Sequence, residues 1–442
     1  MIQIINLKYL EKPEIKYKNG SSSNKYQILS LLPYEKPVFY DFVVIDLTAG
    51  SNLKKQMITD FFDARNDPFP LHSNQTGHFS DFYVNQINFT FIESKEDDLP
   101  DLINNYANKI IIVIHKGKIE DHNYYKSKIN AIINNSRIQF IDYSHLKGNS
   151  YQKYNIWVQL IAKCDGTPWI VDNSSQQFID NDTLIIGISF STLNNELTYG
   201  VAHFLDANNM VQEIILQKIK RDLSKRYLYL NTDEFSEIMR QGLNWFKTKH
   251  NDFGMENKAV KIFIYKSTPL HAEEKKSIEQ MRNNPEHLGY DNIEFSHVHI
   301  KSENFGIPRI YDTSNYGTAF QYMPKQGVCL EIIPDNLSQN GFGFRGDIIL
   351  GTTGMYSQGF GKFGGTKGTP KPLFMAVHSS LKDPIESIEN QVMAMTNMDW
   401  EFTGANYRNP FILKYTNRVA NLLHYMQDVT NIKPIIDIRD LM

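Results

Sequence analysis

The stretch LIIGISFSTLNNELTYGVAHFLDANNMVQEIILQ, residues 184–217, decides how the second half of the chain folds. It contains three apolar runs divided by short polar segments, a pattern typical of antiparallel strands at hairpin spacing. The elements expected after it are a helix at about 233–249, a strand at 260–265, a helix near 271–283, strands at 293–300, 327–333 and 372–377, and helices near 385–396 and 411–426. This succession predicts an α/β domain.

The first half of the chain alternates strands with helices. Strands are expected at 42–47, 110–114 and 138–143, and helices at about 123–134 and from Asn155 to near Asp165. Apolar runs of this length are typical of parallel strands that are covered on both faces. The alternation therefore predicts a doubly wound, Rossmann-like domain.

The loops GTPW, 166–169, and NSSQQ, 173–177, mark a boundary between the two halves. We expect three segments: an N-terminal segment at 1–37 that forms a small hairpin or an extended tail, a first domain at 38–167 and a second at 168–442. Two domains also suit a chain of 442 residues, which exceeds what one hydrophobic core usually supports.

Composition narrows the class of protein. The chain is 41% hydrophobic and 21% charged, as in ordinary globular proteins, and its apolar runs are too short for a membrane span. The first residues lack the layout of a signal peptide, so we expect a cytoplasmic protein. Cys164 and Cys329 offer neither a disulfide framework nor metal-ligand spacing and are interpreted as small core residues.

A net charge of −3 means that any binding of nucleic acid must be local, because phosphate contacts depend on Lys and Arg. Nine Lys or Arg against three acidic residues lie between Lys109 and Lys163, a surplus of six. The basic charge is thus concentrated in the first domain. A solvated helix face would produce the same surplus.

Six polar residues in this basic stretch form a candidate phosphate site. Side chains four apart lie on one face of a helix, and the expected helix N-terminus favours an anion. A Gln at the start of the strand between the two helices could read a phosphate oxygen. Taken singly, each of these residues is also compatible with a solvated surface. The six are Tyr124 and Lys128 on the first helix, Gln139 on the strand, and Asn155, Gln159 and Lys163 on the second helix.

The stretches that hold these residues, YYKSK at 124–128 and NIWVQLIAKCDGTPWIV at 155–171, resemble the MID domain of short prokaryotic Argonautes. The resemblance implies that Tyr124, Lys128, Gln139 and Lys163 bind the 5′ phosphate of a guide nucleic acid, with Asn155 and Gln159 as supports. It also implies a Mg²⁺ ion that bridges this phosphate and the terminal carboxylate, here that of Met442.

The second domain is similar to the PIWI domain of the same family, through LIIGISFS, IFIYKSTP, TPKPLFMAV, TNMDW and 407–423. Its order of strands and helices is that of RNase H-like folds, which cut nucleic acid with carboxylates on two metal ions. At the positions where the resemblance implies those ligands, this chain has Ser189, Ser267 and Ala376. The expectation is therefore a guide-directed binder that does not cut. The alternative is a nuclease with unusual ligands, for which Asp206, Asp312 and His378 are the candidates.

The resemblance further implies contacts of Arg309, Arg408 and Lys414 with the guide or target backbone. His297 and His299 alternate on a strand, but with no third ligand at a sensible spacing they are interpreted as strand residues. The implied partners are an RNA or DNA guide, a complementary target expected to be DNA, and an APAZ-containing effector protein that acts in defence against invading DNA. A dimer is compatible with this picture, as is an unrelated α/β protein that binds a small phosphorylated ligand.

Overall fold

The chain forms two compact units in the computed structural model. The structure describes residues 3–11, 13–23, 25–35, 41–48, 89–146, 150–173, 178–193, 197–206, 211–219, 228–252, 259–301, 326–334, 341–352, 372–382, 384–400, 409–424, 435–436 and 439. The large unit consists of Met1–Pro13, Asn173–Met398 and Gly404–Asn421. The small unit consists of Glu14–Asp172, Asp399–Thr403 and Leu422–Met442. Each unit is thus built from three separate pieces of the chain.

These units differ from the expected segments at both ends of the chain. The expected N-terminal segment, 1–37, is divided, because Met1–Pro13 belong to the large unit and the residues from Glu14 onward to the small one. The last part of the second expected domain, Leu422–Met442, belongs to the small unit. Near the middle of the chain the division falls at Asp172, five residues beyond the expected boundary.

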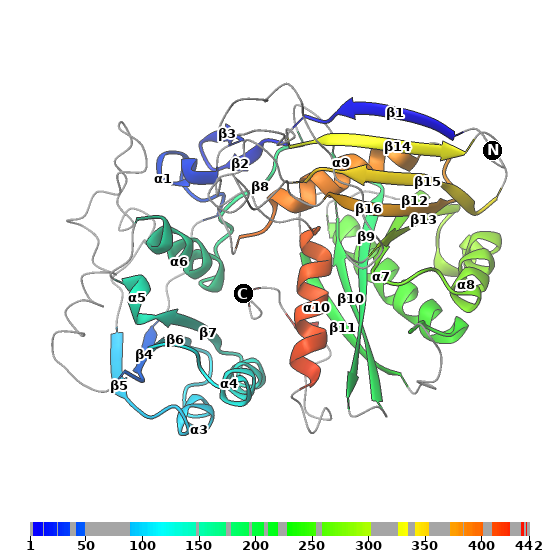
Figure 1. The fold of residues 1–442 in the computed structure, drawn as a ribbon. Helices are drawn as coiled ribbons and strands as arrows, with labels where there is room; N and C mark the ends of the chain where they lie inside the picture. The colour runs from blue at the N-terminus through cyan, green and yellow to red at the C-terminus, as the bar shows by residue number, and fades with distance from the viewer. Residues whose placement is uncertain are drawn as a thin grey trace. The chain divides into compact units, whose positions relative to one another are not determined.

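The small unit is built on a parallel sheet in the order β5-β4-β6-β7 (Figure 1). Its strands and helices are β4 (Phe42–Asp46), β5 (Phe89–Glu93), α3 (Leu99–Ile103), β6 (Ile110–His115), α4 (Asp121–Ile133), β7 (Arg137–Asp142), α5 (Tyr143–Leu146) and α6 (Ser150–Lys163). The three strands expected here are confirmed, while β5, α3 and α5 are additional. The apolar runs of β4 and β6 are buried along their length, as expected for strands covered on both faces.

A second, three-stranded sheet of the small unit contains the expected hairpin. The strands β2 (Ile15–Tyr17) and β3 (Gly20–Ser22) are antiparallel, and β2 also pairs with β8 (Ile170–Val171). The turn lies at 18–19, just before the sequence GSS at 20–22, which forms β3. A short helical segment follows, η1 (Lys25–Gln27) and α1 (Ile28–Leu31).

The large unit holds a mixed sheet in the order β1-β14-β15-β16-β13-β12-β9-β10-β11. Its strands are β1 (Gln3–Tyr9), β9 (Thr183–Leu193), β10 (Leu197–Leu205), β11 (Val211–Ile219), β12 (Ala259–Lys266), β13 (Asn292–Ile300), β14 (Val328–Pro334), β15 (Gly343–Leu350) and β16 (Leu373–Ser379). Its helices are α7 (Thr232–Asp252), α8 (Ala272–Asn283), η4 (Pro285–Leu288), α9 (Pro384–Asn397) and most of α10 (Phe411–His424). The antiparallel order of β9, β10 and β11 and the parallel pairs β9–β12 and β12–β13 confirm the expected α/β succession.

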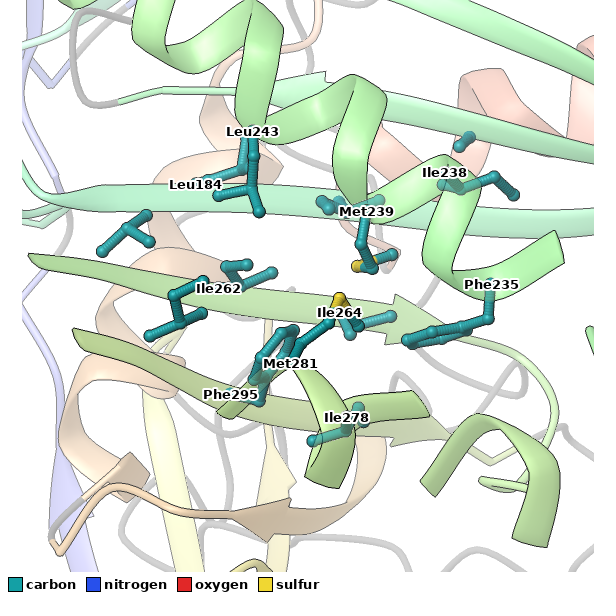
Figure 2. Packing of buried hydrophobic residues seen from close by; sticks show 14 of the residues in the cluster. Leu184, Phe235, Ile238, Met239, Leu243, Ile262, Ile264, Ile278, Met281 and Phe295 are labelled. Atoms are coloured by element: carbon teal, nitrogen blue, oxygen red, sulfur yellow. The ribbon is translucent and has the colours of Figure 1, made fainter. Parts of the chain in front are cut away.

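Helices α7 and α8 cover one face of this sheet, where the core of the large unit lies (Figure 2). Phe235, Met239 and Leu243 recur at helical spacing along α7 and pack over the strand residues Ile262 and Ile264. Burying side chains of this size stabilises the fold by about 1.5–3 kcal/mol each. The 3.6-residue pattern of α7 is thus explained by the sheet beneath it.

Strand β1 lies at one end of the strand order and pairs antiparallel with β14 along seven residues, from Gln3 opposite Pro334 to Tyr9 opposite Val328. Lys8 fixes this pairing, because its Nζ lies 2.5 Å from a carboxylate oxygen of Glu331 and 2.5 Å from one of the buried Glu389. The first strand of the chain is therefore attached to an element more than 300 residues further along.

Candidate functional site

Tyr124 and Lys128 lie together on α4, as their spacing predicts. The Lys128 Nζ is 5.1 Å from the centroid of the Tyr124 ring, and that ring lies 4.6 Å from the ring of Phe140 in β7. Lys128 is only 8% exposed, which is unusual for a lysine and places its charge against an aromatic surface. Helix α4 therefore presents a donor hydroxyl and a cation beside the strand β7.

Gln139 lies on β7, and its amide is almost completely buried. Its Nε2 donates to the carbonyl of Phe140 at 3.1 Å, while its Oε1 accepts no hydrogen bond from the described residues. By strand alternation Gln139 shares a face of the sheet with Arg137, whereas Ile138 points into the core beneath α3 and α4. A buried oxygen without a donor is costly, so this position suits a ligand, a water or a cation.

Helix α6 begins at Ser150, so the expectation that Asn155 stands at a helix N-terminus is wrong. Five earlier residues continue the helix, because 150–154 contain no Gly or Pro that would stop it. The free N–H groups of a helix belong to its first turn, and Asn155 lies in the second. Asn155 and Gln159 are half-buried in the middle of α6.

Lys163, the last residue of α6, is fully buried and belongs to a ring of four residues. Its Nζ donates to the carbonyl of Arg439 at 3.3 Å, and the Arg439 guanidinium lies 3.3 Å from Asp165 Oδ1. The same Oδ1 lies 2.6 Å from the Arg137 guanidinium, which donates to the carbonyl of Lys163 at 2.6 Å. These contacts connect β7, the end of α6 and the C-terminal part of the small unit. We call these four residues the Asp165 ring.

Sequence reasoning did not find Arg137, Asp165 and Arg439. Arg137 precedes Gln139 by two residues on a strand, so alternation could have placed both on one face. Asp165 was expected only as a helix end. Arg439 gives no local signal, since its partners lie more than 270 residues earlier in the chain.

The two cysteines are buried, as expected. Burial raises the pKa of the Cys164 thiol to about 12, although the neighbouring charges of Arg137 and Lys163 act in the opposite direction. Burial also raises the pKa of Cys329, whose thiol donates to Glu389 at 2.8 Å. Neither thiol has the low pKa of a reactive cysteine.

GTPW and the last two residues of TNMDW, Asp399 and Trp400, belong to the small unit, where their tryptophans meet. The indole N–H of Trp400 donates to the carbonyl of Trp169 at 2.9 Å, and the Lys25 Nζ lies 5.5 Å from the Trp169 ring. Trp169 is completely buried. Trp169, six residues after the end of α6, thus packs in the core of the small unit.

In the large unit, Ser189, Ser267 and Ala376 lie at one level of the sheet. Lys266 is opposite Ile188 of β9 and His299 of β13, and His299 is opposite Ala376 of β16. Ser189 and Ser267 follow directly after Ile188 and Lys266. Four adjacent strands therefore bring these positions to one level of the sheet.

At this level of the sheet, Ser189 and Lys266 contact polar residues of the helices α10 and α8. The buried Ser189 hydroxyl donates to Asn417 Oδ1 at 2.6 Å and lies 3.2 Å from the Thr416 hydroxyl. Lys266 is fully buried, and its Nζ lies 2.5 Å from Oε1 of the equally buried Glu274 at the start of α8. Burial lowers the pKa of Lys266, and Glu274 acts in the opposite direction.

Of the three substitutes named for a nuclease, Asp206 lies at the wrong end of the strands. It follows Leu205, which is opposite Ile185 near the start of β9. Leu184 is the residue before Ile185 in β9. Ser189 lies five residues beyond Leu184, roughly 16 Å further along the strand. Asp312 lies outside the described residues.

His378, the third substitute, lies beside His297 on the neighbouring strand, with ring centroids 6.3 Å apart. Both ring nitrogens of the fully buried His297 lack a hydrogen-bond partner among the described residues. Burial, with the charges of Lys266 and the other histidines, holds the pKa of His297 well below its usual value, and it lowers that of His299 to about 4. Across the described part of the chain, no group of three His, Cys, Asp or Glu could hold a metal ion.

Of the remaining predicted site residues, the structure describes Lys414. Lys414 lies on α10, half-buried, with its Nζ 5.2 Å from the ring of Tyr415. Arg309, Arg408 and Met442 lie outside the described residues. None of the described helices is long and apolar enough to cross a membrane.

Comparison with solved structures identifies the architecture. Similar structures include Clostridium butyricum Argonaute bound to a guide DNA and a 19-mer target DNA (15% identity, TM-score 0.64), Drosophila Piwi (12%, 0.63) and Aa-Ago with externally bound siRNA (13%, 0.60). The matches cover 96%, 95% and 97% of this chain but 53%, 54% and 54% of the matched chains, so this chain spans about half their length.

Neither a family model nor a curated protein matches the sequence. At identities of 12–15%, the structural likeness shows the fold alone. The chain has an Argonaute-like fold of the MID–PIWI type, and the α/β fold class predicted from the sequence is confirmed.

Proposed function

We propose that this protein binds the 5′ phosphate of a guide nucleic acid in the small unit and uses the guide to recognise a complementary strand without cutting it. The observation that carries the proposal is the burial of two lysines, Lys128 and Lys163, beside one edge strand, β7, in a chain with an Argonaute-like fold. Burying a lysine is costly unless its charge is used.

The chemistry of the pocket suits a phosphate monoester. Lys128 and Lys163 would donate charge-assisted hydrogen bonds to phosphate oxygens, the Tyr124 hydroxyl a further one, and the Tyr124 ring would stack on the first base. The amide of Gln139 would complete the set of donors. Asn155 and Gln159, half-buried within α6, would support the helix side of the pocket rather than supply free backbone N–H groups.

A Mg²⁺ ion, for which the carboxylate of Met442 would be a ligand beside the phosphate, belongs to the same proposal. Magnesium prefers oxygen ligands and is commonly held by one or two protein groups together with substrate phosphates. The buried Oε1 of Gln139, which has no donor among the described residues, is compatible with such an ion. The ion would add positive charge where the phosphate binds.

We further propose that the PIWI-type unit does not cleave. Metal-dependent cutting needs carboxylates at the sheet level of Ser189, Ser267 and Ala376, and hydroxyl or methyl groups cannot replace them. The output of target binding would then come from an APAZ-containing effector protein, in cytoplasmic defence against invading DNA. Arg309, Arg408 and Lys414 would contact guide or target backbone, and the guide is either RNA or DNA.

Binding of matched oligonucleotides tests the proposal. The purified chain should bind a 5′-phosphorylated 20-mer at least tenfold more tightly than the same 20-mer with a 5′ hydroxyl, in DNA, RNA or both. Equal affinities would refute guide binding, and tight binding of phosphorylated mononucleotides alone would favour a small phosphorylated ligand.

A cleavage assay separates binding from cutting. With a matched target and either Mg²⁺ or Mn²⁺, no product should accumulate over many hours. Cleavage that requires the metal and a matched guide would establish the nuclease alternative, and His378→Ala would then show whether His378 takes part.

A further inference from the structure

The Asp165 ring connects the end of the chain to the lysine at the end of α6. Lys163 reaches the carbonyl of Arg439 at 3.3 Å, and the guanidinium of Arg439 reaches Asp165 at 3.3 Å. Arg137 closes the ring through its contacts with Asp165 and with the Lys163 carbonyl, both at 2.6 Å. We infer that Asp165 is a positioning residue, which holds Arg439 and thereby aims the Lys163 ammonium at the bound phosphate.

The inference rests on the proposed function and assigns the control of phosphate recognition to a carboxylate. A lysine carries its charge on a flexible four-carbon stem, so its direction must be set by what it contacts. One such contact here is a backbone carbonyl 276 residues away. The position of that carbonyl depends on the side chain of the same residue, Arg439, which Asp165 holds.

The backbone of Asp165 supports this interpretation independently. Asp165 has a φ of +59°, in the left-handed region, and follows α6 with its N–H bonded to the carbonyl of Ala162 at 3.1 Å. Glycine is the usual residue at such a helix end, and Asp or Asn adopts the conformation less readily. The next residue is Gly166, so the chain places an acidic side chain at the position where a glycine would be less strained.

A carboxylate beside a phosphate site poses a sharp alternative. If Asp165 acted through its charge alone, its removal would strengthen phosphate binding, because a like charge would be gone. If Asp165 acts by positioning Lys163, its removal weakens binding. The two interpretations therefore predict opposite signs for the same substitution.

The test measures the ratio of affinities for 5′-phosphorylated and 5′-hydroxyl 20-mers in single and double variants. Asp165→Asn keeps a side chain that tolerates the left-handed backbone, and Asp165→Gly removes the strain. Each should lower the ratio about tenfold, as should Arg439→Gln, whereas Arg439→Lys should restore part of it. The double variant Asp165→Asn with Arg439→Gln should have a ratio no lower than that of either single variant, because both substitutions break the same contact between Asp165 and Arg439.

Asp180→Asn provides the matched control. Asp180 pairs with Lys261 at 3.0 Å in the large unit, which does not contain the ring, so this substitution changes the charge equally without breaking a ring contact. Its ratio should equal that of the parent chain. A higher ratio in Asp165→Asn, or additive losses in the double variant, would overturn the positioning role.

A second measurement needs no nucleic acid. Hydrogen–deuterium exchange of a peptide that contains Arg439 should be faster in Asp165→Asn and Asp165→Gly than in the parent and in Asp180→Asn. Unchanged exchange would overturn the link between Asp165 and Arg439. Failure of the proposed function would instead appear in the parent chain, as equal affinities for the two 20-mers.

Discussion

Among the described residues, two lysines are completely buried, and they are held in different ways. Lys266 in the large unit contacts the carboxylate of Glu274, eight residues further along, at 2.5 Å. Lys163 in the small unit donates to a backbone carbonyl of Arg439, 276 residues further along. The first contact joins the end of the strand β12 to the start of the next helix, α8. The second depends on a residue near the end of the sequence, and so on a contact between distant parts of the chain.

The largest effect should come from breaking the local pair. Lys266→Ala leaves Glu274 charged and buried, and loss of one partner of a buried pair costs about 3–5 kcal/mol. We expect the free energy of unfolding of the large unit to fall by that amount, measured by urea denaturation. A loss below about 1 kcal/mol would show that Glu274 readily finds other partners.

The control for this prediction is the double variant Lys266→Met with Glu274→Gln. Removing both charges should restore more than half of the lost stability, because no unpaired charge remains. Some loss persists, since Glu274 also accepts the backbone N–H groups of Leu230 and His271 at 3.0 Å each, and glutamine has only one acceptor oxygen.

Removal of the long-range lysine should change recognition more than stability. Lys163→Met should lower the preference for a 5′ phosphate by about 10- to 100-fold, as expected for the loss of a charge-assisted hydrogen bond. Binding of 5′-phosphorylated and 5′-hydroxyl oligonucleotides measures the preference. Lys261→Met in the large unit is the matched loss of charge, and an equal decrease in that variant would contradict a specific role for Lys163.

The histidines near Lys266 should make the large unit sensitive to acid. The pKa of His297 in the folded chain is lowered by burial and by the positive charge of Lys266, and that of His299 is lowered to about 4. Below pH 6.5 these two histidines bind protons in the unfolded chain, whereas in the folded chain they stay neutral to a lower pH. The stability that neutral imidazoles contribute is therefore complete above pH 6.5 and is lost as the pH falls towards 4.

His297→Leu tests this sign. The substitution removes two buried nitrogens that lack partners among the described residues, so it should cost little at pH 7.5. Between pH 7.5 and 5 the variant should lose about 2 kcal/mol less unfolding free energy than the parent, which is the linkage of one titrating imidazole. Parallel curves for the two proteins would mean that His297 becomes protonated in the folded chain.

The smallest effect is expected at Asn155. Because α6 begins at Ser150, Asn155 offers no free backbone N–H to a phosphate. Asn155→Ala should change the affinity for a 5′-phosphorylated oligonucleotide by less than about threefold, within the range of ordinary half-buried positions. A tenfold loss would give the Asn155 side chain a direct contact that its place in the helix does not suggest.

Much of the fold follows from local sequence patterns. The apolar runs of β4, β6 and β12 and the helical pattern of α7 predicted the corresponding elements within a few residues. Strand β15 was missed, because its sequence GFRGDIIL carries Arg345 and Asp347 and has a register shift near Gly346. The Arg345 side chain is buried and donates to the carbonyl of Ser379. A local sequence pattern does not predict such a tertiary contact.

The candidate site was predictable only where its residues share one element. Tyr124 and Lys128 are four apart on α4, and the structure places them in contact. The Asp165 ring joins a strand, a helix end and Arg439, so no window of sequence contains it. The start of α6 was misplaced by five residues, although Asn149 followed three residues later by Gln152 is a sequence signature of a helix N-terminus just before Ser150.

The pairing of β1 with β14 has a consequence for synthesis of the protein. Gln3 and its neighbours leave the ribosome early, but their partner strand, which ends at Pro334, follows more than 300 residues later. At about 5–20 residues per second, β1 waits roughly 15–65 s for its hydrogen bonds. During that time Leu7 and Tyr9, more than half exposed even in the finished fold, are available to chaperones or to other nascent chains.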